Sequence, residues 1–132
     1  MAVGRLAAVI RRAAVIWLAV SGPVWAGDAD VTHVAIRPVA ASGAGIAFDL
    51  DVTVRSKDTG WERYADRIEA LGPDGVILGT RVLDHPHDDE QPFTRDLYRL
   101  IVPAGIARIT VRAHFKPTGY SGAALTVPLP GR

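Results

Sequence analysis

The chain of 132 residues has 15 basic and 14 acidic residues, a net charge of +1 and no cysteine or asparagine. Its length and its 48% hydrophobic content suit one domain with its own core. The missing cysteines exclude disulfides, thiol catalysis, thiolate metal sites and a lipid attached to cysteine, and the missing asparagines exclude N-glycosylation, within this sequence.

Residues 1–26 have the order of a secretory signal peptide. Arginines precede an apolar run from Ala13 to Val20, and the small-x-small end Val24-Trp25-Ala26 follows. The apolar run is too short to cross a bilayer, so we expect cleavage after Ala26 and no membrane span in the mature chain. The predicted domain organisation is a signal peptide over residues 1–26 and one domain over residues 27–132, in the periplasm or secreted.

The charge of the predicted mature chain differs from that of the whole sequence. Without Arg5, Arg11 and Arg12, twelve basic residues remain against all 14 acidic ones, which gives a net charge of −2 with neutral histidines. No contiguous basic run and no run of aromatic residues remains. This composition argues against a nucleic-acid partner and leaves an unidentified protein or small ligand as the expected partner.

The first two predicted strands follow this signal. Val34 and Ile36 alternate with polar neighbours over residues 31–36, which places His33 on the outer face. Residues 46–55 alternate more strictly and predict a half-buried strand. Five apolar side chains would face its core: Ile46, Phe48, Leu50, Val52 and Val54. Asp49 and Asp51 fall on its other face, where we expect a solvated surface rather than a catalytic acid–base pair.

Residues 61–71 fit two patterns. Apolar residues at helical spacing form one stripe, which consists of Trp61, Tyr64, Ala65, Ile68 and Leu71. A strand would use Tyr64, Ile68 and Ala70 on one face and must tolerate Asp66 among them. The turn sequence Gly72-Pro73-Asp74-Gly75 then leads directly into an apolar strand over residues 76–83, so we favour a hairpin over a helix. We expect Trp61 to pack in the core.

Three more strands complete the prediction. Residues 93–102 would place one set of side chains, Phe93, Leu97 and Ile101, on one face, and another, Tyr98, Leu100 and Val102, on the opposite face. Residues 108–114 alternate with Arg108, Thr110, Arg112 and His114 outward, and residues 125–129 form the last strand. About seven strands separated by turn residues predict an all-β fold, an immunoglobulin-like or fibronectin-like β-sandwich after a cleaved signal peptide.

Several short motifs of the mature chain resemble motifs of known proteins. They include Asp58-Thr59-Gly60-Trp61, Gly72-Pro73-Asp74-Gly75 and His85-Pro86-His87 followed by Glu90-Gln91-Pro92-Phe93-Thr94-Arg95. With these motifs the chain resembles an uncharacterised family of small exported bacterial proteins with a predicted immunoglobulin-like domain. The resemblance implies a coherent domain in a bacterial envelope and no defined activity.

The loop around His85 holds the densest cluster of coordinating side chains. His85 and His87 flank Pro86, so in an extended backbone both imidazoles project to one side. The side chains that could complete a set of ligands for zinc or copper are a carboxylate from Asp84, Asp89 or Glu90 and, from the sixth strand, His114. The alternative interpretation is a solvated acidic loop that contains two histidines.

Catalytic motifs are otherwise missing from the sequence. Gly119 to Ala123 is one residue away from a nucleophile elbow, but it leads into a strand, so Ser121 is expected to be a turn residue. We therefore predict a non-catalytic exported binding or structural module without a required cofactor. Two alternatives stay open: a periplasmic copper or zinc protein that uses the His85-Pro86-His87 loop, and an enzyme whose site is assembled from loops.

Overall fold

The computed structural model describes residues 27–40 and 46–132, and the predicted signal peptide over residues 1–26 lies outside the described residues. Every helix or strand in the described part of the chain is a β-strand. The seven strands are β1 (Ala29–Val39), β2 (Ile46–Ser56), β3 (Tyr64–Leu71), β4 (Ile77–Val82), β5 (Phe93–Val102), β6 (Arg108–Lys116) and β7 (Leu125–Pro128). This confirms the all-β prediction.

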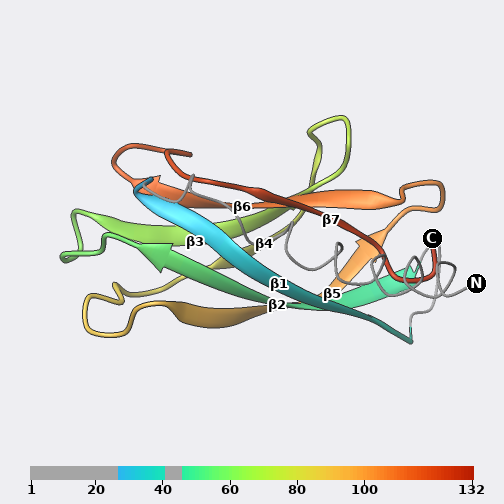
Figure 1. The fold of residues 1–132 in the computed structure, drawn as a ribbon, viewed down its shortest axis with the longest axis horizontal. Helices are drawn as coiled ribbons and strands as arrows, with labels where there is room; N and C mark the ends of the chain where they lie inside the picture. Colours follow the sequence, from blue (N-terminus) through green and yellow to red (C-terminus); the bar gives the residue numbers. More distant parts are fainter. Residues whose placement is uncertain (1–26, 41–45) are drawn as a thin grey trace, which may run out of the picture.

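The strands form two antiparallel sheets that pack as a β-sandwich (Figure 1). One sheet has the order β1-β2-β5 and the other the order β4-β3-β6-β7. The start of β1 also bonds to the segment before β7, because the Val31 N–H donates to the Ala123 carbonyl at 2.8 Å. This contact joins the two sheets at one side of the sandwich.

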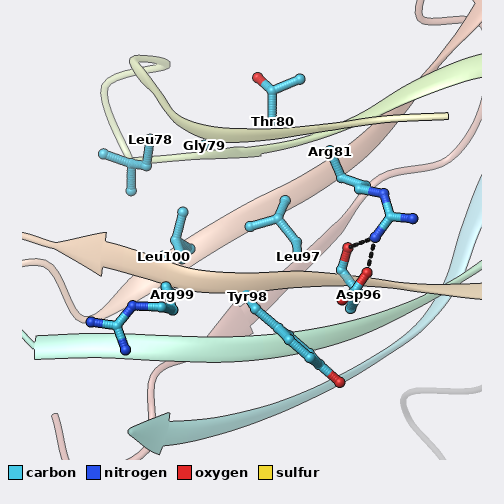
Figure 2. A pocket seen from close by; sticks show the side chains of 9 residues that line it. All are labelled: Leu78, Gly79, Thr80, Arg81, Asp96, Leu97, Tyr98, Arg99 and Leu100. Carbon is cyan, nitrogen blue, oxygen red and sulfur yellow. Dashed lines mark hydrogen bonds and ion pairs between the residues drawn. The ribbon is translucent and has the colours of Figure 1, made fainter. Parts of the chain in front are cut away.

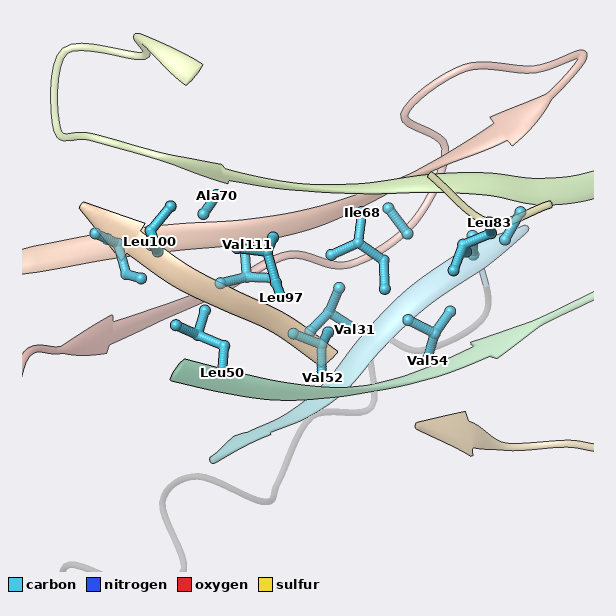
Figure 3. Close-up of a cluster of buried hydrophobic side chains, with 14 of the residues drawn as sticks. Val31, Leu50, Val52, Val54, Ile68, Ala70, Leu83, Leu97, Leu100 and Val111 are labelled. Atoms are coloured by element: carbon cyan, nitrogen blue, oxygen red, sulfur yellow. The ribbon is translucent and has the colours of Figure 1, made fainter. Parts of the chain in front are cut away.

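The core fills the space between the sheets (Figure 3). Leu50, Val52 and Val54 of β2 face Ile68 of β3 and Val111 of β6, and all five are fully buried. Strand alternation puts every second side chain into this layer, and each such side chain contributes about 1.5–3 kcal/mol by leaving water. The core therefore follows directly from the period of two in the sequence.

The two acidic residues of β2 lie on the outer face of their sheet, as the solvated-surface interpretation expects. The guanidinium of Arg37 lies 3.2 Å from the Asp51 carboxylate and 3.5 Å from that of Asp49. Ile46, predicted to be buried, is 47% exposed. It begins β2 at the rim of the core, beside the turn at Ala104–Ala107, and no second layer covers it there.

A β-bulge in β5 makes the predicted faces of that strand wrong. Tyr98 and Arg99 both lie opposite Asp49, and Arg99 has a φ of 58°. The Arg99 N–H donates to Asp49 at 2.8 Å, which anchors the bulge. The extra residue reverses the alternation. Leu100 therefore faces the core together with Leu97, whereas Ile101 is exposed.

Residues 61–71 fit both a helix and a strand in sequence, and a second bulge explains why the strand pattern was irregular. Residues 64–71 form a strand, so the helical alternative is wrong. The register with β6 shifts between Ala65 and Arg67, which turns Asp66 out of the core face. Trp61 was expected in the core, but it is 62% exposed. The turn that contains it closes through a bridge between Gly60 and Arg63 before β3 begins.

Candidate functional site

The loop between β4 and β5 is tied to the rest of the sandwich by a buried carboxylate. Asp58 accepts the backbone N–H of Ala65 at 3.0 Å and that of His87 at 2.8 Å. The side chain of Gln91 accepts the Ser56 N–H at 2.8 Å and donates to the His87 carbonyl at 2.9 Å. These bonds fix the backbone of His87, so the loop that holds the two neighbouring histidines is ordered.

His87 is buried, which its place in a polar loop did not predict. It is 3% exposed, and its ring stacks on Phe93 with the ring centres 4.0 Å apart. Its Nε2 lies 2.9 Å from the Arg95 guanidinium, which can only donate, so Nε2 is the acceptor. Among the described residues Nδ1 has no hydrogen-bond partner, and it lies 3.9 Å from the Asp58 carboxylate. Burial, followed by the positive charges of Arg95 and His85, lowers the pKa of His87.

The structure brings together some of the predicted metal ligands. The ring centres of His85 and His87 lie 4.5 Å apart, and Glu90 is connected to His87 through Arg95, which it contacts at 3.3 Å. His114 is instead on the outer face of the β4-β3-β6-β7 sheet, where its Nδ1 lies 2.6 Å from Asp66. No group of three or more His, Asp or Glu side chains in the described part of the chain could hold a metal ion. Metal binding at this loop stays a prediction.

A second cluster, which sequence reasoning missed, is centred on Glu69 of β3. Glu69 is 3% exposed, although it points to the outer side of its sheet. Its carboxylate accepts the Nε–H of Arg112 at 2.9 Å, the Nε–H of Arg67 at 3.0 Å and the hydroxyl of Tyr120 at 3.1 Å. Burial alone raises the pKa of Glu69, but these three hydrogen bonds outweigh burial and hold the pKa below its ordinary value.

The ring of Tyr120 lies against this carboxylate and is covered by an arginine. The Cζ atom of Arg112 lies 3.6 Å from the ring centre, and the Tyr120 hydroxyl also accepts a hydrogen bond from Arg67 at 3.1 Å. His114 contacts the ring edge-on, with the ring centres 5.0 Å apart. Ionic, hydrogen-bonded and cation–π contacts therefore hold both arginines in one arrangement.

Strand alternation gathers further positive charge on this sheet. Arg108, Arg112, His114 and Lys116 alternate along β6 with buried residues, so all four point outward. We call these four residues and Arg67 the basic face. Four of the twelve lysines and arginines of the described chain belong to this face, and the carboxylates of Glu69 and Asp66 contact it. The sequence contains no contiguous basic run, and the signal that could have revealed the face is the alternation of residues 108–116.

A cavity of about 260 Å³ lies where the edge strands β4 and β5 meet (Figure 2). Leu78, Leu97 and Leu100 point into this space, and the ion pair of Arg81 with Asp96 closes one end. A Cβ at Gly79 would lie 2.6 Å from the Cδ1 of Leu100, so a larger residue there would require the Leu100 side chain to move. We assign this cavity to packing between the sheets.

No family model matches the chain, and no solved structure matches it. A protein of the archaeon Halomicrobium mukohataei that is named "Putative lipoprotein" is 36% identical over 102 residues, which are 76% of this chain and 47% of the archaeal protein. The chain thus spans about half the length of this distant homologue. Among residues 27–40 and 46–132 there is no helix long and apolar enough to cross a membrane.

Proposed function

We propose that the chain is an exported, non-catalytic binding module of the cell envelope and that the basic face is its binding surface. The observation that carries this proposal is the network around Glu69, because it holds Arg67, Arg112 and Tyr120 rigidly at the surface of a sheet. Arginine and tyrosine are the residue types that most often dominate binding energy. Side chains fixed in advance also lose less conformational entropy when a ligand binds.

Two further observations support an immunoglobulin-like or fibronectin-like sandwich and its export from the cytoplasm. The strand orders β1-β2-β5 and β4-β3-β6-β7 agree with an immunoglobulin-like or fibronectin-like arrangement of the sandwich. The pattern of residues 1–26 and the name of the archaeal relative both favour export, to the periplasm or out of the cell. In this interpretation residues 27–132 act as one domain at or beyond the outer side of the cytoplasmic membrane.

A second candidate function is metal binding by the loop that holds His85 and His87. It is favoured by the 4.5 Å between the centres of the two rings. It is opposed by Arg95, whose guanidinium occupies the Nε2 of His87 and would have to leave before a metal ion could bind there. We therefore place the binding function on the basic face.

The proposed function is tested with the exported protein and isolated cell envelopes. We expect the wild-type protein to sediment with envelopes and the double variant Arg108→Glu/Lys116→Glu to stay largely in solution. Arg99→Glu is the matched control, because Arg99 is exposed on the other sheet and, like Arg108, has no ion pair among the described residues. If all three proteins sediment equally with envelopes, or if none of them sediments, the basic face is not the binding surface.

A further inference from the structure

The basic face has a charge that differs from that of the rest of the molecule, and this difference indicates the class of its partner. Resting on the proposed function, we infer that the basic face binds an acidic polysaccharide, a polymer with repeated carboxylates that lies along β6. The described chain has a net charge of −2, yet its positive side chains outnumber acidic ones on this face. The charge of the face is therefore complementary to a polyanion.

The spacing of the basic side chains favours a polymer over a small anion. Arg108, Arg112 and Lys116 are four residues apart along β6, so successive cations are about 13 Å apart at the usual rise of a strand. A single carboxylate or phosphate could contact only one of them. A linear polymer with regularly repeated charges could contact all three and the neighbouring Arg67 on β3, which pairs with His114.

The arginine at the centre of the face is arranged to bind a carboxylate. Glu69 takes the Nε–H of Arg112, and no other hydrogen bond of this guanidinium exists among the described residues. Its two terminal nitrogens are therefore available for a ligand, and an arginine presents paired N–H groups that match a carboxylate. Unlike Arg112, which is paired with Glu69, Arg108 and Lys116 have no carboxylate partner in the described part of the chain.

The same geometry disfavours the two other classes of macromolecule. Single-stranded nucleic acid binds by stacking bases on open aromatic rings, but Arg112 covers one face of the Tyr120 ring, with its Cζ atom 3.6 Å from the ring centre. A protein partner would need an apolar, desolvated centre, whereas the centre of this face is the ionic network of Glu69. The exposed Val82 lies at its margin on the edge strand β4.

The test measures binding of the exported, purified protein to polymers of defined charge by calorimetric titration. The probe is polygalacturonate, and the matched neutral polymer is fully methyl-esterified polygalacturonate. We expect binding to polygalacturonate only, with an affinity that falls severalfold between 50 and 200 mM salt because the contacts are ionic. Poly-glutamate and a single-stranded oligonucleotide stand for an acidic protein and a nucleic acid, and we expect weaker binding of both.

Variants then locate the binding on the molecule. We expect Arg108→Glu/Lys116→Glu to weaken the affinity for polygalacturonate at least tenfold and Arg99→Glu to change it less than twofold. Both substituted side chains of the double variant are exposed, so it should fold, and an unchanged thermal unfolding temperature checks this.

The outcomes separate the inference from the proposed function. Tighter binding of poly-glutamate or the oligonucleotide through the same residues would overturn the acidic-polysaccharide partner and leave the basic face as the binding surface. The acidic-polysaccharide partner would also be overturned, and the basic face kept as the binding surface, by a second result. In that result no polymer binds, but envelope sedimentation still depends on Arg108 and Lys116. Polygalacturonate binding that is equally strong in the double variant and in Arg99→Glu would overturn the inference. If envelope sedimentation is also independent of the face, the proposed function falls with it.

Discussion

Two buried polar centres in this sandwich differ in how completely they are hydrogen-bonded. Glu69 on the β4-β3-β6-β7 sheet receives three donors, from Arg112, Arg67 and Tyr120. His87 in the loop after β4 has one ring nitrogen bonded to Arg95, and the other, Nδ1, has no hydrogen-bond partner in the part of the chain that the structure describes. A fully bonded network specifies one structure, whereas a partly bonded one leaves a group whose charge state can disturb the fold.

The largest expected effect concerns the carboxylate that anchors the histidine loop. Asp58→Ala removes the acceptor of two buried backbone N–H groups, those of Ala65 and His87. Each buried donor left without a partner costs about 1–3 kcal/mol, so we expect a loss of about 3–4 kcal/mol in unfolding free energy. Urea denaturation measures this loss. Asp58→Asn keeps one acceptor oxygen and should lose less, and equal losses would contradict the role of the two bonds.

Removing the Glu69 carboxylate should lower the unfolding free energy less than removing the Asp58 carboxylate. Glu69→Ala leaves Arg67 and Arg112 without their shared carboxylate, but both arginine side chains are about one third exposed and can turn to water. We therefore expect a loss of about 2 kcal/mol in unfolding free energy, less than for a fully buried pair. Glu69→Gln, which retains hydrogen-bonding capacity, is the control. A loss as large as that of Asp58→Ala would show that the network is more tightly buried than its arginines suggest.

Between pH 8 and pH 5, we expect acid to lower the unfolding free energy through His87 and not through Glu69, whose pKa lies below its ordinary value. The pKa of His87 is lower in the folded protein than its ordinary value of 6.5, so the unfolded chain binds the proton more readily. The stability that neutral His87 provides is therefore complete above pH 6.5 and is lost as pH falls below it, towards the folded pKa. Unfolding free energies between pH 5 and 8 measure this loss. His87→Gln should flatten that part of the profile, and an unchanged slope would contradict the assignment.

How much of the fold the sequence predicts depends on where the alternation is regular. The strict alternation of residues 46–55 and 108–114 predicted two central strands and, from Phe48 onward in the first of them, the sides they present, because a half-buried strand admits only one phase. The prediction failed at the bulge of Tyr98 and Arg99, where one extra residue reverses the phase and leaves no mark in the apolar pattern. Asp66 was such a mark: it did not fit the inward face of its strand, and a bulge proved to be the reason.

The candidate sites were less predictable because they depend on contacts distant in sequence. The closeness of His85 and His87 follows from their spacing, but Arg95, which caps His87, is eight residues away and its approach requires the packing of β5. The Glu69 network joins β3, β6 and the loop after β6, and Glu69 and Tyr120 are 51 residues apart. Only the pairing of β3 with β6 brings these groups together.

The last prediction tests whether the histidine loop is a masked metal site. Arg95 donates to the Nε2 of His87 at 2.9 Å, so the ring nitrogen that carries the free lone pair in this tautomer is occupied. Arg95→Ala should expose this nitrogen and tighten Zn²⁺ or Cu²⁺ binding by about threefold to tenfold in calorimetric titration, and the gain should diminish in acid, where a proton competes with the metal ion for the imidazole. Arg99→Ala, which removes an exposed arginine from the same strand, should leave metal affinity unchanged. If Arg95→Ala binds metal no better than wild type, or equally well after His85→Ala and His87→Ala are added, the two neighbouring rings serve packing alone.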